Sequence, residues 1–437
     1  MKIFCTIAVL TFSCLLPGVA EVDDAVPANP EPRWWKGNLH THTLWSDGNG
    51  FPEMVAEWYR VNGYNFLALS DHNVLSQGMR WMPLTEIERR AGEDALDGYI
   101  DRFGEHWVEM KAVENGERHV RLKPLNEFRA LLEDRGVFIL MQGQEITDSV
   151  GRVPIHINAT NLAELIQPQH GEDFQATMRN NLIAVAEQAA RIGRPILPHL
   201  NHPNFGWALT AEDIAAVTEE HFFEVFNGHT GVHNAGDALR ADTERIWDVA
   251  NTIRLVQHSA PPLFGLATDD SHSYHGRSDV SIPGRGWIMV RARHLTPESL
   301  LRAMEQGDFY ASTGVVLRDV RFDAASNTLF VQIDPQPGEK YTIEFVGTRE
   351  DPDLTSEEVR DAEGKEVRTT RRYSAEIGEV LLRVEGTSAE YTLAGNELYV
   401  RAVVTSDAPP THPTADSPLK KAWTQPVGWR RLLDPGE

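Results

Sequence analysis

Two histidines one residue apart, followed by an acid, open the part of the sequence that could do chemistry. The stretch 37–48 reads GNLHTHTLWSDG and contains His40, His42 and Asp47. On a β-strand, residues i and i+2 point to the same side, so both imidazoles can reach one metal ion. Alone, an H-x-H pair is equally compatible with the polar edge of a strand.

Five further polar motifs follow, each directly after a short apolar run. They are Ser70-Asp71-His72, Gln144-Glu145, His156, His199-x-x-His202 and Asp269-Asp270-Ser271-His272. Imidazoles combined with a few carboxylates suit Zn, Mn or Fe. Calcium or magnesium sites built from oxygen atoms would not need so many histidines. The ordered set therefore predicts a multinuclear metallohydrolase.

Composition limits the partners of this chain. Its 437 residues, 41% of them hydrophobic, can bury a large core and predict two domains. The formal charge of −23 makes a nucleic acid or an anionic membrane surface an unlikely general partner. We expect a small-molecule substrate, no nucleic-acid partner and no stable membrane span.

The N-terminus has the pattern of an export signal. Lys2 precedes a mostly apolar run over 3–16, and Gly18-Val19-Ala20 offers a cleavage site. We therefore expect a signal peptide at 1–20, a leader at 21–33 and a secreted or periplasmic protein. Lipoprotein anchoring at Cys14 is not expected, because Thr11-Phe12-Ser13 is a poor lipobox. Both cysteines lie in this segment, so His, Asp and Glu must hold any metal in the mature chain.

Residues 34–316 alternate apolar runs with helix-like segments, which predicts a parallel sheet covered by helices. The polar motifs fall at the carboxyl ends of the expected strands, where a (β/α) barrel carries its catalytic loops. An open doubly wound sheet would also place ligands at strand ends. We favour the barrel because the ligands come from at least six strands. Residues 73–135 form an insertion, either a lid or, in better accord with its charged composition, a solvated structural addition.

The pattern changes after residue 316. Alternating or clustered apolar residues predict short strands separated by charged turns, at 329–334, 341–346, 380–384 and 398–404. We expect a small C-terminal β-sandwich-like domain over 317–437 that packs against the barrel.

These motifs resemble the PHP (polymerase and histidinol phosphatase) superfamily, and most closely its CehA/McbA-type metallohydrolases. The matching residues are His40-Thr-His42, Ser46-Asp47-Gly48, Ser70-Asp71-His72, Gly143-Gln-Glu145, Asn201-His202-Pro203 and Asp270-Ser-His272. The resemblance covers roughly residues 34–316. It implies an α/β fold, a distorted seven-stranded (β/α) TIM-like barrel, that binds two or three divalent ions.

The resemblance also implies a role for each ligand. It assigns His40, His42 and Asp270 to a first ion, Glu145 as a bridge, His156 and His202 to a second ion, and Asp47, His72 and His272 to a third. His199 is the alternative to His202, which we favour because it lies in the Asn-His-Pro pattern. His156 follows Glu145 by only eleven residues, closer than in many members of the superfamily.

Five other residues are candidates for a catalytic role. Asp71 and Asp269 adjoin ligands, where Asp71 could orient an imidazole or cap a loop and Asp269 could transfer protons. His229 follows the run at 222–226 and could contact substrate or donate a proton. Arg277 could clamp an oxyanion or form a surface salt bridge. His199, if not a ligand, would act next to the metals.

Three functions fit these residues. The leading prediction is a phosphoesterase in which a metal-bridging hydroxide attacks phosphorus. The second is hydrolysis of a carboxylic ester, carbamate or amide, as the CehA/McbA resemblance implies. The third, a non-catalytic exported binding protein, is less favoured because binding alone gains little from three adjacent ions. Nothing in the sequence separates phosphate from carboxyl chemistry or identifies the substrate.

Overall fold

The computed structural model describes residues 29–114 and 116–433. Contacts divide the chain into Met1–Glu31 and Pro32–Glu437, and only the second unit is described below. The expected signal peptide at 1–20 and most of the leader lie outside the described residues. No helix in the described part of the chain is long and apolar enough to cross a membrane.

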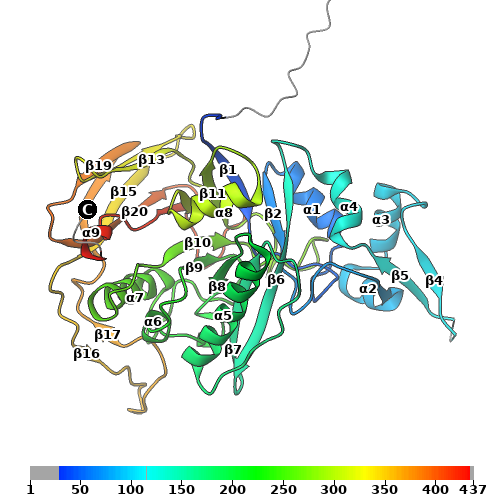
Figure 1. The fold of residues 1–437 in the computed structure, drawn as a ribbon, viewed down its shortest axis with the longest axis horizontal. Helices are drawn as coiled ribbons and strands as arrows, with labels where there is room; N and C mark the ends of the chain where they lie inside the picture. The colour runs from blue at the N-terminus through cyan, green and yellow to red at the C-terminus, as the bar shows by residue number, and fades with distance from the viewer. Residues whose placement is uncertain (1–28, 115, 434–437) are drawn as a thin grey trace, which may run out of the picture. The chain divides into compact units, whose positions relative to one another are not determined.

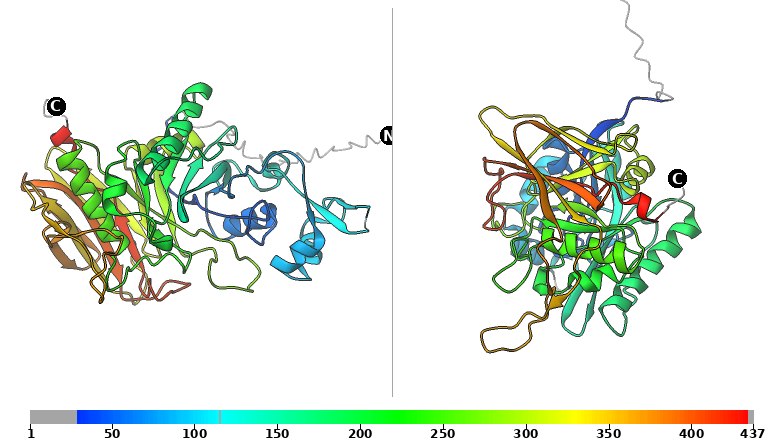
Figure 2. Two further views of the ribbon diagram at one scale, coloured as in Figure 1. Left: turned by 90° about the horizontal axis from the view of Figure 1, so that it is seen from below. Right: turned by 90° about the vertical axis from the view of Figure 1, so that its left-hand side faces the viewer.

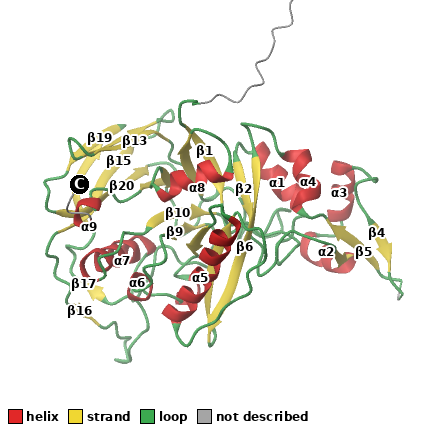
Figure 3. Cartoon of the chain, in the orientation of Figure 1, coloured by secondary structure: helices red, strands yellow, loops and turns green. Residues whose placement is uncertain are grey.

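Helices and strands alternate through the first three quarters of the unit, and strands dominate the rest (Figures 1 and 3). The described helices are α1 Pro52–Val61, α2 Leu84–Ala91, α3 Ala95–Phe103, α4 Leu125–Leu132, α5 Phe174–Ile192, α6 Ala211–Ala215, α7 Thr243–Gln257, α8 Pro297–Glu305 and α9 Arg430–Leu433. The strands up to the expected domain boundary are β1 Arg33–Asn38, β2 Phe66–Leu69, β3 Arg80–Pro83, β4 Met110–Ala112, β5 Arg118–Leu122, β6 Ile139–Val150, β7 Val153–Thr160, β8 Leu197–Leu200, β9 Phe222–Asn227, β10 Phe264–Thr268, β11 Trp287–Ala292 and β12 Phe309–Ser312. Those after it are β13 Leu317–Asp323, β14 Thr328–Ile333, β15 Tyr341–Arg349, β16 Ser356–Glu357, β17 Arg372–Tyr373, β18 Glu379–Glu385, β19 Ser388–Thr392, β20 Glu397–Ser406 and β21 Lys421–Thr424.

The fold is α/β, built on a large mixed sheet in the order β10-β9-β8-β7-β6-β2-β1-β11-β12-β21-β20-β15-β18 among the described strands. Strands β1, β2 and β6 are parallel to one another, as are β8, β9 and β10. Strand β7 is antiparallel to both of its neighbours. The carboxyl ends of the parallel strands therefore meet at one edge, as the sequence predicts.

A closed barrel is not detected in the described part of the chain. The free side of β1 is occupied by antiparallel β11, which continues the sheet instead of letting β1 pair with β10. One isolated bridge, between Thr41 and Ser271, joins the segments that follow β1 and β10. This bridge and the hydrogen bond from the Asn49 N–H to the His272 carbonyl bring the two ends of the strand series together where the polar motifs lie.

A hairpin explains the short spacing between Glu145 and His156. Strands β6 and β7 pair with Glu145 opposite Asn158 and Thr147 opposite His156. Because side chains alternate between the two faces of a strand, Glu145 and His156 lie on the same face. The sequence predicts a parallel sheet over residues 34–316, whereas the chain makes a direct antiparallel turn here.

The insertion has a core of its own that packs on the loop after β1. Strands β3, β5 and β4 form a small sheet, although the sequence shows few strand signals there. Buried residues of this sheet and of α2 and α3 surround Leu44, Trp45 and Phe51. Figures 1 and 2 show the insertion at the end of the unit opposite the C-terminal strands.

The C-terminal region consists mainly of strands arranged in two layers. The sheet β13-β14-β19 packs through Leu317, Leu329 and Val331 against residues of β15 and β20. Strand β21 pairs with both β12 and β20, so the large sheet continues across residue 316.

Glu220, just before β9, predicts a pH dependence of stability. Burial raises the pKa of its carboxyl from about 4.5 to about 7, and its Oε1 accepts hydrogen bonds from the backbone of His221 and Phe222. Because the pKa is higher in the folded than in the unfolded state, protonation of Glu220 stabilises the folded protein. This stabilisation is complete below pH about 4.5 and is lost as the pH rises through about 7. Denaturant unfolding at pH 5 and at pH 8 measures how much the free energy of unfolding falls between these two pH values. In Glu220→Gln this fall should be smaller than in the wild type by about 2 to 3 kcal/mol. Exposed Glu219→Gln is the control, and an unchanged pH profile in Glu220→Gln would contradict the assignment.

Candidate metal centre

The histidines and carboxylates predicted as ligands meet at the carboxyl ends of the strands. His40 and His42 follow β1, His72 follows β2, and Glu145 lies within β6. His202 follows β8, and Asp270 follows β10. Asp270 adopts a left-handed φ of 48°, which is uncommon for a residue other than glycine and is typical of functional sites.

Four side-chain atoms form a first group in the buried centre. Nε2 of His40 lies 3.4 Å from Oε2 of Glu145 and 3.2 Å from Oδ1 of Asp270. Nε2 of His42 lies 3.2 and 3.1 Å from the same two oxygens. Ligands bound tetrahedrally to an ion at 2.0–2.1 Å are about 3.3 Å apart, so these separations suit one metal ion.

A second group lies on the other oxygen of Glu145. Its Oε1 is 2.8 Å from Nδ1 of His156 and 3.4 Å from Nε2 of His202. The amide of Asn201 donates a hydrogen bond to the same oxygen at 2.7 Å. Glu145 therefore presents one oxygen to each of two groups, as a bridging carboxylate must.

A third group surrounds Asp47 and faces solvent. Its carboxylate lies 3.6 Å from Nε2 of His72 and 3.3 Å from Nε2 of His272, and 3.5 Å from Nδ1 of His42. The Asp47 side chain is 55% exposed, whereas that of His42 is fully buried. These four residues converge closely enough to hold an ion.

The donor atoms fit divalent metal ions because several are buried without a hydrogen-bond partner. They are Nε2 of His40, Nε2 of His42, Oε2 of Glu145 and Nδ1 of His156. Leaving so many buried polar atoms unpaired is costly, and a metal ion would satisfy them together. In two of the histidine rings, the hydrogen bond made by Nδ1 also indicates that Nε2 is free to bind a metal ion. His40 Nδ1 contacts Glu224 at 2.7 Å, and His272 Nδ1 contacts the Asp270 carbonyl at 2.8 Å, which leaves each Nε2 lone pair free for a ligand role.

The charges of the centre compensate one another. Burial alone would raise the pKa of Glu145, but the nearby imidazoles of His72, His156 and His40 outweigh it and hold that pKa well below its ordinary value. Burial also opposes ionisation of Asp270, where His40 and His42 hold the pKa well below normal. Both carboxylates are therefore ionised at neutral pH and available to cations.

Glu224 supports the centre through contacts that the sequence motifs do not reveal. Fully buried on β9, it contacts Nδ1 of His40 and accepts hydrogen bonds from Thr268 Oγ1, the His202 backbone N–H and the Asn227 amide. It thereby orients His40 and fixes the loop of His202. The sequence does contain one indication of this role, an acid inside the apolar run Phe222-Phe-Glu-Val-Phe226. A carboxylate in a buried strand needs a partner, because burying it unpaired is costly.

Asp71 and Asp269 hold loops in place. Asp71 accepts hydrogen bonds from the backbone and hydroxyl groups of Thr43 and Ser46, which fixes the loop that carries Asp47. Asp269 accepts bonds from the Tyr59 hydroxyl and the backbone of residues 284–286. Both are buried, and these bonds match the loop-capping alternative for Asp71.

The other three catalytic candidates occupy different environments. His199 is fully buried with Nε2 3.4 Å from Glu224 Oε1, behind His40. His229 lies beside the centre, with its ring 6.0 Å from that of His272. Its Nδ1 accepts from the Gly231 N–H, so a neutral ring carries its proton on Nε2. Arg277 is exposed against Gly92, and among the described contacts none joins its guanidinium to the centre.

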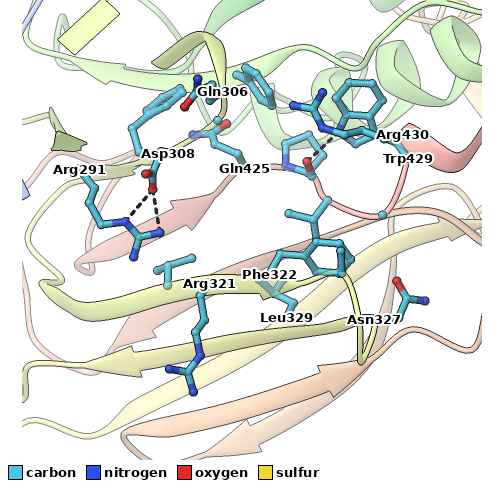
Figure 4. Close-up of a pocket in the computed structure, with 18 of the residues that line it drawn as sticks. Arg291, Gln306, Asp308, Arg321, Phe322, Asn327, Leu329, Gln425, Trp429 and Arg430 are labelled. Atoms are coloured by element: carbon cyan, nitrogen blue, oxygen red, sulfur yellow. Dashed lines mark hydrogen bonds and ion pairs between the residues drawn. The ribbon is translucent and has the colours of Figure 1, made fainter. Parts of the chain in front are cut away.

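A cavity of about 830 Å³ lies at the opposite end of the strands (Figure 4). Trp34 and Phe264, near the starts of β1 and β10, line it together with Trp429. Its Arg291 is already paired with Asp308 at 2.7 Å. The cavity is therefore separate from the metal centre.

The chain matches no protein-family model and no curated protein. Among solved structures, it is similar to a two-domain protein from Bacteroides vulgatus containing a predicted PHP-like metal-dependent phosphoesterase. That similarity covers 92% of this chain and 98% of the other, at 14% identity and a TM-score of 0.38. A second similarity, to a candidate metal-dependent phosphoesterase from Bifidobacterium adolescentis, covers 58% and 94%, at 14% identity and a TM-score of 0.28.

The two histidines after β8 should differ in metal binding. Nε2 of His202 lies 3.4 Å from Glu145, whereas Nε2 of His199 lies the same distance from Glu224. In His202→Ala, elemental analysis after reconstitution with Zn or Mn should show about one ion fewer per chain. His199→Ala should keep its ions but melt at a lower temperature, because it opens a buried cavity. Loss of an ion in His199→Ala alone would reverse the assignment.

Proposed function

We propose that the protein is an exported metal-dependent phosphoesterase that hydrolyses a small phosphorylated molecule. The observation that carries this proposal is the convergence of unpaired imidazole and carboxylate atoms on both oxygens of Glu145. His40, His42 and Asp270 would share a first ion with Glu145, and His156 and His202 a second. Asp47, His72 and His272 would hold a third. The chemistry of these ligands suits Zn, Mn or Fe.

Divalent ions held there would activate a water molecule and stabilise negative charge on the substrate. The chain's own residues hold this arrangement rigid. Glu224 orients His40, and Asn201 fixes the oxygen of Glu145 that faces the second group. His229, whose neutral ring carries a proton on Nε2, is suited to protonate the leaving group.

Three adjacent groups favour phosphate over carboxyl chemistry. A phosphoryl group distributes charge over several oxygens, which neighbouring cations can contact together. A carbonyl carbon develops charge on one oxygen only. Hydrolysis of a carboxylic ester, carbamate or amide, as in the CehA/McbA type, is the competing function that the same centre would support.

Glu145→Gln tests the proposal directly. Gln keeps the size of the side chain but removes the charge that two ions would share, so metal content and activity should fall together. We expect kcat for 4-nitrophenyl phosphate to fall by about 100-fold or more, with an unchanged circular dichroism spectrum. Exposed Glu164→Gln, which loses only a surface pair with Arg191, is the matched control.

The same assay separates the competing reactions. Turnover of 4-nitrophenyl acetate without turnover of any phosphoester in the metal-loaded wild type would replace the phosphoesterase by the carboxyl hydrolase. Near-normal metal content and activity in Glu145→Gln would show that Glu145 does not lie between the ions.

Export is proposed from residues 1–20 alone. If this segment is a signal peptide, the protein isolated from its native host should begin at Glu21 and occur outside the cytoplasm. N-terminal sequencing decides this, and an intact Met1 in a cytosolic fraction would refute it.

A further inference from the structure

The metal centre opens to solvent on one side. In the first group the side chains of His40, His42 and Glu145 are buried, with at most 1% exposed. In the third group the exposed fraction rises to 26% for His72 and 55% for Asp47. Solvent therefore reaches the centre on the side of Asp47.

Three arginines lie on segments next to this opening, two in the insertion and one in the loop after β10. Arg80, at the start of β3, stacks over the ring of Trp45, two residues before Asp47. Arg90 of α2 donates from Nη1 to the carbonyl of Ser46 at 2.5 Å. Arg277 lies five residues after His272. We refer to Arg80, Arg90 and Arg277 as the arginine rim.

Gly92 permits the approach of Arg277 to the insertion. A Cβ at this position would lie 2.7 Å from the guanidinium atoms of Arg277, so a larger residue would displace that side chain. Gly92 also has a φ of 110°, which favours glycine. Gly92 ends α2, the helix that carries Arg90, so the guanidinium of Arg277 lies against the end of that helix.

Two members of the rim have no ionic partner. Arg90 is paired with Glu86 at 2.6 Å. Arg80 and Arg277 make no ion pair and no side-chain hydrogen bond within residues 29–114 and 116–433. Asp71 exerts an attractive field on Arg80, but its oxygens already accept hydrogen bonds from Thr43 and Ser46. Both guanidinium groups are therefore available to bind an anion that approaches the mouth of the metal centre.

We propose that the substrate is a phosphoester carrying a second anionic group, a carboxylate or a phosphate, which Arg80 and Arg277 bind while the ester lies on the metal centre. This inference rests on the proposed phosphoesterase function. A guanidinium offers paired N–H donors that match carboxylate and phosphate oxygens, so the rim selects dianionic or polyanionic molecules over simple esters.

Binding of non-hydrolysable phosphonates tests the rim without turnover. Calorimetry on the metal-loaded protein would compare 3-phosphonopropanoate with propylphosphonate, which lacks the carboxylate. We expect the wild type to bind the carboxylated ligand about tenfold more tightly, and Arg80→Gln and Arg277→Gln each to remove most of that preference. Propane-1,3-bisphosphonate tells whether a second phosphate is preferred to a carboxylate.

Two further variants make the test specific. Arg89→Gln, on the same helix as Arg90 but 68% exposed and paired with Glu86, should leave the preference unchanged. Gly92→Ala should reduce it by displacing Arg277. The preference should also weaken as salt rises, because exposed charges are screened within about 10 Å at 0.1 M.

Kinetics with paired substrates separate failure of the rim from failure of the proposed function. The pairs are 4-nitrophenyl phosphate with its 3-carboxy derivative, and 4-nitrophenyl acetate with 4-nitrophenyl succinate. If the Arg80 and Arg277 variants lose turnover of the carboxylated phosphoester but keep that of 4-nitrophenyl phosphate, both the phosphoesterase function and the role of the arginine rim are supported. Preference for the succinate alone would reject the phosphoesterase and keep the rim. The proposed role of the arginine rim would be overturned if the wild type bound both phosphonates with equal affinity, or if the variants lost affinity for both phosphonates equally.

Discussion

The structure depends on a buried carboxylate that neighbouring imidazoles keep ionised. Taken alone, Glu145 would be costly to bury, because a charge removed from water needs compensation. His40, His42, His72 and His156 all approach its two oxygens, and they come from three segments of the chain, which follow β1, follow β2 and lie within β7. The observed sheet order makes this convergence possible, since strands β1, β2 and β6 lie side by side with their carboxyl ends aligned. Glu224 is a second buried carboxylate with an imidazole partner. It contacts Nδ1 of His40 and accepts a hydrogen bond from the backbone N–H of His202.

The local parts of this arrangement could be predicted from the sequence, and the global parts could not. Apolar runs such as Phe66–Leu69 mark buried strands, and the polar residues just after them must reach the sheet edge. The absence of a closed barrel could not be predicted, because nothing near β1 in the sequence shows that β11 will occupy its free side. The β6–β7 hairpin could not be predicted either, since the sequences of the two strands are compatible with parallel or antiparallel pairing. The position of Glu224 in the run 222–226 predicts that it faces the mouth of the site, but an acid within an apolar run reveals neither its partner nor its depth.

The insertion between β2 and β6 contributes to the opening of the centre as well as to packing. Trp45 belongs to the core of the insertion, while Asp47, two residues later, belongs to the third group. Any movement of the insertion relative to the sheet would therefore be transmitted to the loop that carries Asp47. Asp71 opposes such movement by accepting hydrogen bonds from both Thr43 and Ser46. The position of the arginines and the position of the ligand thus depend on the same few contacts.

The ring of His42 faces two groups at once, which limits how the ions can be bound. Its Nε2 points to Glu145 and Asp270, and its Nδ1 lies near Ser46 and Asp47. A neutral imidazole has one lone pair, so it can coordinate through one nitrogen while the other keeps its proton. With Nε2 directed to the first group, an ion held there would have four protein ligands, whereas one held by the third group would have three, Asp47, His72 and His272. The tautomer of one histidine would thereby leave the solvent-facing group with one protein ligand fewer than the buried group.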